Sequence, residues 1–378
     1  MAKNILILTR AIEYCRVAKL YFKDLVFDTN TIHPIVEECE LQLKQALVFM
    51  NKWNEHSQSF VFYTSGSTGK PKEIIASRKQ IEASASATIQ FLQLKQDSAH
   101  VLICLHMHTV GASIMLARAL LLNADITLCE ASANPLLHVE SNIFSFASFV
   151  PLQIESILNN EKSKPKFESI ENVIIGGANI SFPLEQQLAS MKNNIWHSYG
   201  MTETLSHIAL RRVGKEKAFN PLPSVEVALN TSTCLKIKAA VTNNNWIETN
   251  DIALIHEDGS FEIFGRSDFV INSGAYKIHP EKVEEAIRKI WPFNHSFFIG
   301  SIGDNQLTSA AVLAVECLDE NEQQNILNAF IKLQTELRSL IHKYEIPKRI
   351  LFVEKIFYSN NLKLDRIKSN QTLSNQVF

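Results

Sequence analysis

The sequence predicts an α/β fold with a large N-terminal domain and a small α+β C-terminal domain. Short apolar runs alternate with longer amphipathic ones, which favours a sheet with helices on its faces. From about residue 221 the pattern changes to apolar–polar alternation, which indicates β hairpins. A helix and strand pattern restarts after residue 265, and 378 residues are enough for two domains. We therefore expect a large domain at 1–266, with a β subdomain at about 221–265, and a small domain at 267–378.

Apolar runs that end near turns or glycines are the predicted strands of the large domain. They are FVFYT, HVLICLH, DITLCE and ENVIIGG, and an Ala/Ser cluster at 83–87 favours a helix between the first two. In the small domain we expect one short helix, two strands, a long helix and a last strand. Their markers are Val283, Ala286, Ile287 and Ile290; residues 296–300 and 308–315; Ile326, Phe330, Leu333, Leu337 and Leu340; and ILFVEKI.

Composition excludes several classes of partner. A net charge of -2 leaves no basic excess to attract nucleic acid or anionic lipid. The longest apolar run, residues 114–122, contains Arg118 and is shorter than the roughly 20 residues that a spanning helix needs. The N-terminus lacks a signal-peptide pattern, so we expect a cytoplasmic protein without membrane insertion. The six cysteines show no CxxC spacing and are expected to be reduced core thiols.

A glycine-rich loop, YTSGSTGKPK at residues 63–72, follows the first predicted strand. Free backbone N–H groups, hydroxyl side chains and a lysine in such a loop suit phosphate oxygens. It is not a Walker A loop, because Pro71 follows Lys70 where Ser or Thr is required. An ordinary surface turn is the alternative. The candidate phosphate-binding residues are Thr64, Ser65, Gly66, Ser67, Thr68, Gly69 and Lys70.

This loop resembles the phosphate loop of the adenylate-forming superfamily, which contains acyl-CoA synthetases, luciferases and peptide-synthetase adenylation domains. The resemblance extends from about residue 60 to residue 366 and implies the adenylate-forming ligase fold, with the large domain shortened at its N-terminus. Tyr199-Gly200-Met201-Thr202-Glu203 looks like the family's YGxTE motif. By that resemblance Tyr199 stacks on adenine, Thr202 contacts the α-phosphate of ATP, and Glu203 holds magnesium, which prefers carboxylate ligands.

Further motifs complete the implied nucleotide site. Gly177 and Ala178 belong to a GGA segment that resembles the turn beside the adenine and acyl groups. Asp251 matches the family's ribose-hydroxyl acceptor, and Arg266 is its usual companion. Asp268, in the GRSD segment, falls at the family's hinge position.

In the small domain, the resemblance assigns two roles. Lys363, in NLKLDR, corresponds to the family's catalytic lysine, which neutralises charge between the attacking carboxylate and the α-phosphate. The loop SGAYKIHPEKVEE, residues 273–285, resembles the segment that lines the tunnel for coenzyme A, with Gly274 and Lys277 as the implied contacts. A purely structural role would also explain this segment, because Pro280 suits the first turn of a helix.

Several positions depart from the family pattern. Asn250 replaces the middle glycine of TGD, and Glu73 replaces the glycine that closes the phosphate loop. In the small domain, Leu362 precedes the lysine where glycine is usual, Ala275 replaces a glycine, and Asn272 replaces a lysine.

The substrate pocket is indicated by a second set of residues. His108-Thr109-Val110-Gly111 resembles the HxxG of aryl- and acyl-CoA ligases, where the histidine gates the acyl pocket, and no anion is present nearby to bind an amino group. The run FVPLQIESIL, followed by VIIGGANIS, WHSYGMTETLSHIALR and FVINSGAYKIHPE, resembles the short o-succinylbenzoate–CoA ligases of menaquinone synthesis, whose substrate carries a second carboxylate. A strand at 206–212 puts His207 and Arg211 on one face, where they could contact that carboxylate. The alternative is that His207 only braces the loop and Arg211 is exposed.

The expected function is therefore an ATP- and magnesium-dependent acid–CoA ligase. It activates a small carboxylic acid, which by the resemblance is o-succinylbenzoate, as an acyl-adenylate and then transfers the acyl group to coenzyme A. Activation of another aryl acid, or loading of a carrier protein, is an open alternative. A degenerate nucleotide-binding regulator is a third hypothesis from a different class. The sequence leaves the oligomeric state open.

Overall fold

The computed structural model describes residues 17–35, 38–63, 73–140, 143–304, 308–358 and 364–374. Within those ranges, no helix has the length and apolar character needed to cross a membrane.

A nine-stranded sheet forms the centre of the N-terminal part, in the order β11-β10-β9-β8-β7-β5-β6-β1-β2. Its middle, from β1 through β6, β5, β7 and β8 to β9, is parallel, and β2, β10 and β11 are antiparallel additions at the two edges. The strands predicted from HVLICLH, DITLCE and ENVIIGG are confirmed as β5, β6 and β8. The bounds are β1 Lys19–Phe22, β2 Leu25–Asp28, β5 His100–Ile103, β6 Asp125–Leu128, β7 Phe146–Phe149, β8 Asn172–Ile175, β9 Asn194–Met201, β10 Ser206–Arg212 and β11 Asn220–Pro221.

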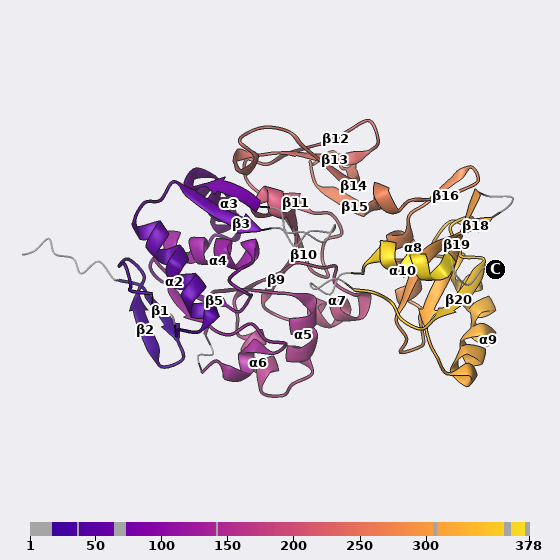
Figure 1. The fold of residues 1–378 in the computed structure, drawn as a ribbon, viewed down its shortest axis with the longest axis horizontal. Coiled ribbons are helices and arrows are strands. Elements are labelled where there is room, and N and C mark those ends of the chain that lie inside the picture. Colours follow the sequence, from indigo (N-terminus) through magenta and orange to yellow (C-terminus); the bar gives the residue numbers. More distant parts are fainter. Residues whose placement is uncertain are drawn as a thin grey trace, which may run out of the picture.

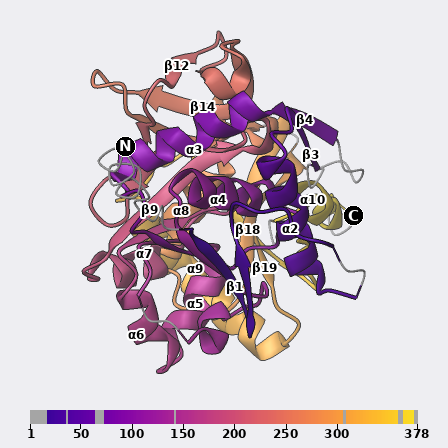
Figure 2. The same ribbon diagram turned by 90° about the vertical axis from the view of Figure 1, so that its left-hand side faces the viewer.

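Helices cover both faces of this sheet (Figures 1 and 2). Two separate apolar cores lie between these helices and the sheet. Helices α2 to α4 pack on one face and α5 to α7 on the other. Helix α3 begins at a capping box in which Ser77 accepts from the Gln80 backbone N–H and Gln80 accepts from that of Ser77, so two unpaired donors of the first turn are satisfied. The bounds are α2 Leu41–Asn54, α3 Arg78–Leu92, α4 Val110–Leu121, α5 Pro151–Leu158, α6 Ser163–Glu168 and α7 Phe182–Ala189.

The strand predicted from FVFYT exists, but its predicted place in the buried sheet is wrong. It forms β3 (Ser59–Tyr63), which pairs only with β4 (Glu73–Ser77) in a two-stranded hairpin. Phe60 and Phe62 point into the core, whereas Val61 and Tyr63 are exposed. A strand of four consecutive apolar residues is therefore buried on one face only, because aromatic and β-branched residues also suit an exposed face.

The predicted β subdomain is a four-stranded antiparallel sheet in the order β12-β13-β14-β15, with its own apolar core. Its strands are β12 Glu226–Leu229, β13 Cys234–Lys238, β14 Ile247–Ile255 and β15 Phe261–Arg266.

After β15 the chain forms a second α+β unit, on the right of Figure 1. Its helices pack on a five-stranded sheet with β19 at the centre, where it pairs with β16, β18 and β20. Each helix and strand predicted here is present, but α8 ends before Ile290 and α9 ends before Leu340, which were predicted to be helical. Strands β16 and β17 and helix α10 are additional. The bounds are β16 Ile271–Ser273, β17 Tyr276–Ile278, α8 Pro280–Arg288, β18 Phe297–Asp304, β19 Thr308–Glu316, α9 Glu320–Leu337, β20 Arg349–Val353 and α10 Arg366–Ser374.

Candidate active site

Three predicted nucleotide residues meet where β9 approaches the β subdomain. The Tyr199 hydroxyl donates to Asp251 Oδ2 at 2.6 Å, and Arg266 Nη1 lies 3.8 Å from Asp251 Oδ1. Burial, with Asp251 beside it, raises the pKa of Tyr199, so the phenol stays protonated and donates. Asp251 is thus held between a donor and a cation, with its carboxylate available as a hydrogen-bond acceptor.

The turn after Tyr199 explains why the motif requires glycine. A Cβ at Gly200 would lie 2.3 Å from the backbone oxygen of Ser206 and 2.4 Å from His207 Cα. The close approach of β9 to β10 leaves no space for any side chain there. Thr202–Thr204 follow as a single 3-10 turn. Glu203 in this turn is exposed and takes part in no ion pair among the described residues, which suits a carboxylate that binds a metal.

The GGA segment lies at the carboxyl end of β8, where ligands commonly bind in parallel sheets. Gly177 has a φ of 84°, a conformation that other residues adopt only with strain. His197 Nε2 lies 3.3 Å from the carbonyl oxygen of Ala178, which ties this turn to β9. Burial lowers the pKa of His197 to about 4, so this histidine is a neutral donor to that carbonyl.

The predicted hinge residue is held by two side chains of the β subdomain. Arg266 Nη2 donates to Asp268 Oδ2 at 2.6 Å, and the amide of Asn250 donates to both oxygens of Asp268, at 3.0 and 3.1 Å. The contact with Arg266 is the main reason that the pKa of Asp268 is lowered. Asn250, a departure from the family pattern, therefore adds two hydrogen bonds that glycine at this position would lack.

His108 lies in the short connection between β5 and α4, again at the carboxyl end of a parallel strand. Its ring centroid is 5.2 Å from that of His106. Desolvation is the main cause that lowers the pKa of His108, and the neighbouring His106 lowers it further. Thr109 caps α4 by accepting from the Ala112 backbone N–H. His108 is therefore an exposed, neutral side chain just before a helix start.

The prediction that His207 and Arg211 share a face of β10 is wrong. His207 pairs with Gly200 and Ala209 pairs with Tyr199, so Ile208 is an extra residue that breaks the two-residue period. His207 is buried against α3. Arg211 lies on the other side, where α7 supplies its partner, Glu185, through two contacts of 2.6 and 3.0 Å.

The structure also reveals why these two side chains are poor candidates for binding a second carboxylate. Arg211 already has a carboxylate. His207 Nε2 lies 2.9 Å from Thr88 Oγ1, and burial, with Arg118 nearby, lowers its pKa well below the usual value. His207 is therefore a neutral, buried imidazole. The alternative interpretation that Arg211 is exposed is wrong, because its side chain is 12% exposed.

A cation that the sequence patterns did not single out lies beside His207. Arg118 of α4 is 1% exposed, and its Nη2 is 3.5 Å from His207 Nε2. Its Nε has no hydrogen-bond partner, and none of the ion pairs among the described residues includes it. Burial lowers its pKa to about 9, which leaves it charged at neutral pH. A charged residue in the apolar run 114–122 was the available signal, because a buried charge requires a partner.

The predicted catalytic lysine and the predicted phosphate loop fall outside the described residues: Lys363 with Leu362, and Thr64, Ser65, Gly66, Ser67, Thr68, Gly69 and Lys70. Their assignments stay predictions. The chain on both sides is described. Tyr63 pairs with Glu73, so residues 64–72 connect the two strands of a hairpin. Arg366, three residues beyond Lys363, is anchored on α8.

The segment predicted to contact coenzyme A forms the hairpin β16–β17 and the start of α8. Gly274, at the turn, has a φ of 61°, and Lys277 on β17 is exposed. Tyr276 stacks on Tyr344 with ring centroids 4.0 Å apart.

Comparison with known proteins gives consistent matches. The sequence model of a family described as AMP-binding enzyme matches residues 23–243. The 2-succinylbenzoate–CoA ligase of Listeria monocytogenes serovar 1/2a is 28% identical over 345 residues, which cover 84% of this chain and 71% of the relative. The enzyme of the same name from Staphylococcus epidermidis RP62A is 24% identical over 344 residues, covering 84% and 70%.

Solved structures that resemble this chain include ligases of the same kind. An acyl-CoA synthetase (AMP-forming)/AMP-acid ligase II-like protein from Dyadobacter fermentans is 32% identical with a TM-score of 0.60, over 90% of this chain and 97% of that one. The o-succinylbenzoate CoA synthetase of Bacillus subtilis, in complex with its acyl-adenylate, is 20% identical with a TM-score of 0.67, over 82% and 68%. These matches confirm the predicted adenylate-forming ligase fold.

Proposed function

Since this chain belongs to the AMP-binding enzyme family, we propose that, as an AMP-forming acid–CoA ligase, it activates o-succinylbenzoate. The acid carboxylate attacks the α-phosphorus of ATP, the bond to pyrophosphate breaks, and an acyl-adenylate forms. The thiol of coenzyme A then attacks the acyl carbon and AMP leaves. Relatives named 2-succinylbenzoate–CoA ligase support both the acid and the acceptor.

The contact between Tyr199 and Asp251, with Arg266 alongside, is the observation that best supports a nucleotide site. A carboxylate held in place accepts from the ribose hydroxyls without the cost of ordering it on binding. Glu203 would hold magnesium, which supplies positive charge to the triphosphate oxygens when bound.

Arg118 supports a substrate with a second carboxylate. An unpaired buried charge is costly, and a ligand carboxylate beside it would remove that cost. His207 next to it is neutral and so does not compete as a cation. We propose Arg118 in place of His207 and Arg211 as the main contact for the second carboxylate.

We further propose that residues 267–378 move as a unit about Asp268 between the two half-reactions. Two reactions that share one site require such a movement, because the lysine and the coenzyme A segment cannot both occupy it. The hydrogen bonds from Asn250 and Arg266 to Asp268 favour one of the two arrangements.

A product analysis tests the function. Purified enzyme is incubated with ATP, magnesium, coenzyme A and o-succinylbenzoate, and the thioester is measured by mass spectrometry. Thioester formation is expected. Exchange of pyrophosphate into ATP without a thioester would favour a carrier protein as acceptor, and exchange only with another aryl acid would favour that acid. ATP binding without exchange for any acid would favour a regulator.

Arg118→Met should selectively impair the dicarboxylate. We expect kcat/KM for o-succinylbenzoate to fall by about 10²-fold, the effect of losing an ionic hydrogen bond, while an analogue without the second carboxylate changes little. Arg212→Met, which removes a cation that is partly exposed and lies over Trp196, is the control. An equal fall for both acids would contradict this assignment.

Asp251→Asn should weaken nucleotide binding. Loss of the charged acceptor is expected to raise KM for ATP about tenfold to a hundredfold, with KM for the acid unchanged. Steady-state pyrophosphate exchange measures both. Asp258→Asn, in a turn of the same subdomain, should leave both constants near those of the parent enzyme. An unchanged KM for ATP in Asp251→Asn would remove this residue from the nucleotide site.

A further inference from the structure

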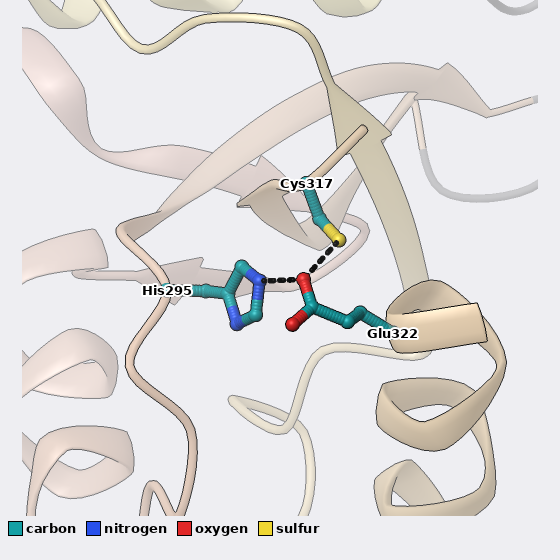
Figure 3. Close-up of side chains that lie close together, drawn as sticks. All are labelled: His295, Cys317 and Glu322. Atoms are coloured by element: carbon teal, nitrogen blue, oxygen red, sulfur yellow. Dashed lines mark hydrogen bonds and ion pairs between the residues drawn. The ribbon is translucent and has the colours of Figure 1, made fainter. Parts of the chain in front are cut away.

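Three side chains with metal-binding atoms meet in the C-terminal unit, and none belongs to the predicted active site. His295 precedes β18, Cys317 directly follows β19, and Glu322 lies in the first turn of α9 (Figure 3). His295 Nε2 is 3.0 Å from Glu322 Oε2, and Cys317 Sγ is 4.0 Å from the same oxygen. The three ligand atoms all lie within 4.8 Å of one another, the only such group of three in the described part of the chain.

The two separations from Glu322 are close to those of a tetrahedral zinc site. Zinc bonds of about 2.0–2.3 Å to nitrogen, oxygen and sulfur imply ligand-to-ligand distances of roughly 3.3–3.7 Å. The observed distances of 3.0 and 4.0 Å lie on either side of that range. Movements of less than about 1 Å would bring both distances into it, and the exposed side chain of Glu322 is free to make them.

The chemistry of the three donors selects among cations. A thiolate, an imidazole and a carboxylate together suit zinc, whereas magnesium prefers oxygen ligands alone. Glu322 is 57% exposed at its side chain, so water can complete the coordination. This set therefore differs in kind from Glu203, a single carboxylate suited to magnesium.

The ligands are carried on backbone that is already fixed by other contacts. Cys317 is 5% exposed, and its backbone N–H donates to the Val353 carbonyl at 3.2 Å. The indole N–H of Trp291 donates to the His295 carbonyl at 3.1 Å. The positions of the donors are thus set by the fold itself, which lowers the entropic cost of binding an ion.

We propose that His295, Cys317 and Glu322 form a structural site for a zinc-class divalent cation. The ion joins the end of β19 and the segment before β18 to the N-terminus of α9. Because these segments belong to one unit and surround its core, a bound ion stabilises the C-terminal unit against unfolding. A simple ion pair between His295 and Glu322 is the competing interpretation.

Cobalt titration of the full-length enzyme tests the proposal. Enzyme treated with a chelator and dialysed is titrated with Co²⁺, which replaces zinc and gives a charge-transfer absorption band with thiolate. We expect the band to saturate at one equivalent, to be displaced by Zn²⁺ and to persist in excess Mg²⁺. Zn²⁺ is expected to raise Tm. Absence of the band at one equivalent would overturn the proposal and leave the ion pair.

Matched variants locate the ion. Cys317→Ser should abolish the band, and Glu322→Gln should weaken Co²⁺ binding at least about tenfold. His256→Ala removes a histidine paired with Glu262 at a similar distance, 3.1 Å, and should leave the titration unchanged. Retention of the band in Cys317→Ser would place the ion elsewhere. If circular dichroism shows that Cys317→Ser is misfolded, Glu322→Gln, at an exposed position, provides the test instead. Unchanged Co²⁺ affinity in Glu322→Gln would then reject the site.

Discussion

Lys363→Ala is expected to abolish formation of the acyl-adenylate while leaving the second half-reaction intact. As the attacking carboxylate approaches the α-phosphate, negative charge accumulates between them, and only a positioned cation in the site offsets it. Loss of such electrostatic stabilisation typically costs about 10²–10³-fold in rate. Pyrophosphate exchange should fall by at least that factor, whereas thioester formation from supplied acyl-adenylate and coenzyme A should proceed at the parent rate.

The second measurement distinguishes catalysis from folding, because a misfolded enzyme would lose both half-reactions. Lys368→Ala is the matched control, since this lysine lies on α10 of the same segment with its ammonium group over the ring of Phe357. Parent-like exchange is expected for it. Equal loss of both half-reactions in Lys363→Ala would refute the catalytic assignment.

Arg366→Met is expected to have the largest effect on stability. Arg366 donates to both carboxylate oxygens of Glu284, at 2.8 and 3.0 Å, and to the Ile299 carbonyl at 3.0 Å. The Glu284 side chain is 3% exposed, so removal of Arg366 leaves a buried charge whose nearest remaining cation is Arg288, at 3.8 Å. The free energy of unfolding should fall by about 3–5 kcal/mol, measured by denaturant titration of the full chain.

Comparison with a second arginine separates this effect from a general loss of charge. Arg288 lies 3.8 Å from the same carboxylate but is 41% exposed at its side chain, and Arg288→Met should cost no more than about 1 kcal/mol. Because Arg366 fixes the start of α10, adjacent to the segment that holds Lys363, pyrophosphate exchange should also fall in Arg366→Met. Arg366→Lys should restore part of the stability and part of the pyrophosphate exchange. If the two methionine variants were equally stable, the buried pair would not be what holds α10.

Much of the fold could be predicted from periodicity and local motifs. HVLICLH became β5 because its apolar residues suit a strand buried on both faces, and Val283, Ala286 and Ile287 became the inner face of α8 because their spacing is helical. FVFYT has similar composition, yet β3 lies outside the main sheet. Composition indicates that a run forms a strand, but not which strand will be its neighbour.

The sequence by itself determined the candidate nucleotide motifs, because the residues that we propose for this site are close in the chain or belong to recognisable segments. Tyr199, Asp251 and Arg266 could be named in this way before any contact between them was known. Only the tertiary structure decided which charges are partnered. Arg118 approaches a histidine 89 residues away, and Arg211 of β10 pairs with Glu185 of α7. A single bulged residue, Ile208, places His207 and Arg211 on opposite faces of β10. Local pattern reports which way a side chain points along its own strand or helix, whereas its partner depends on how distant elements pack together.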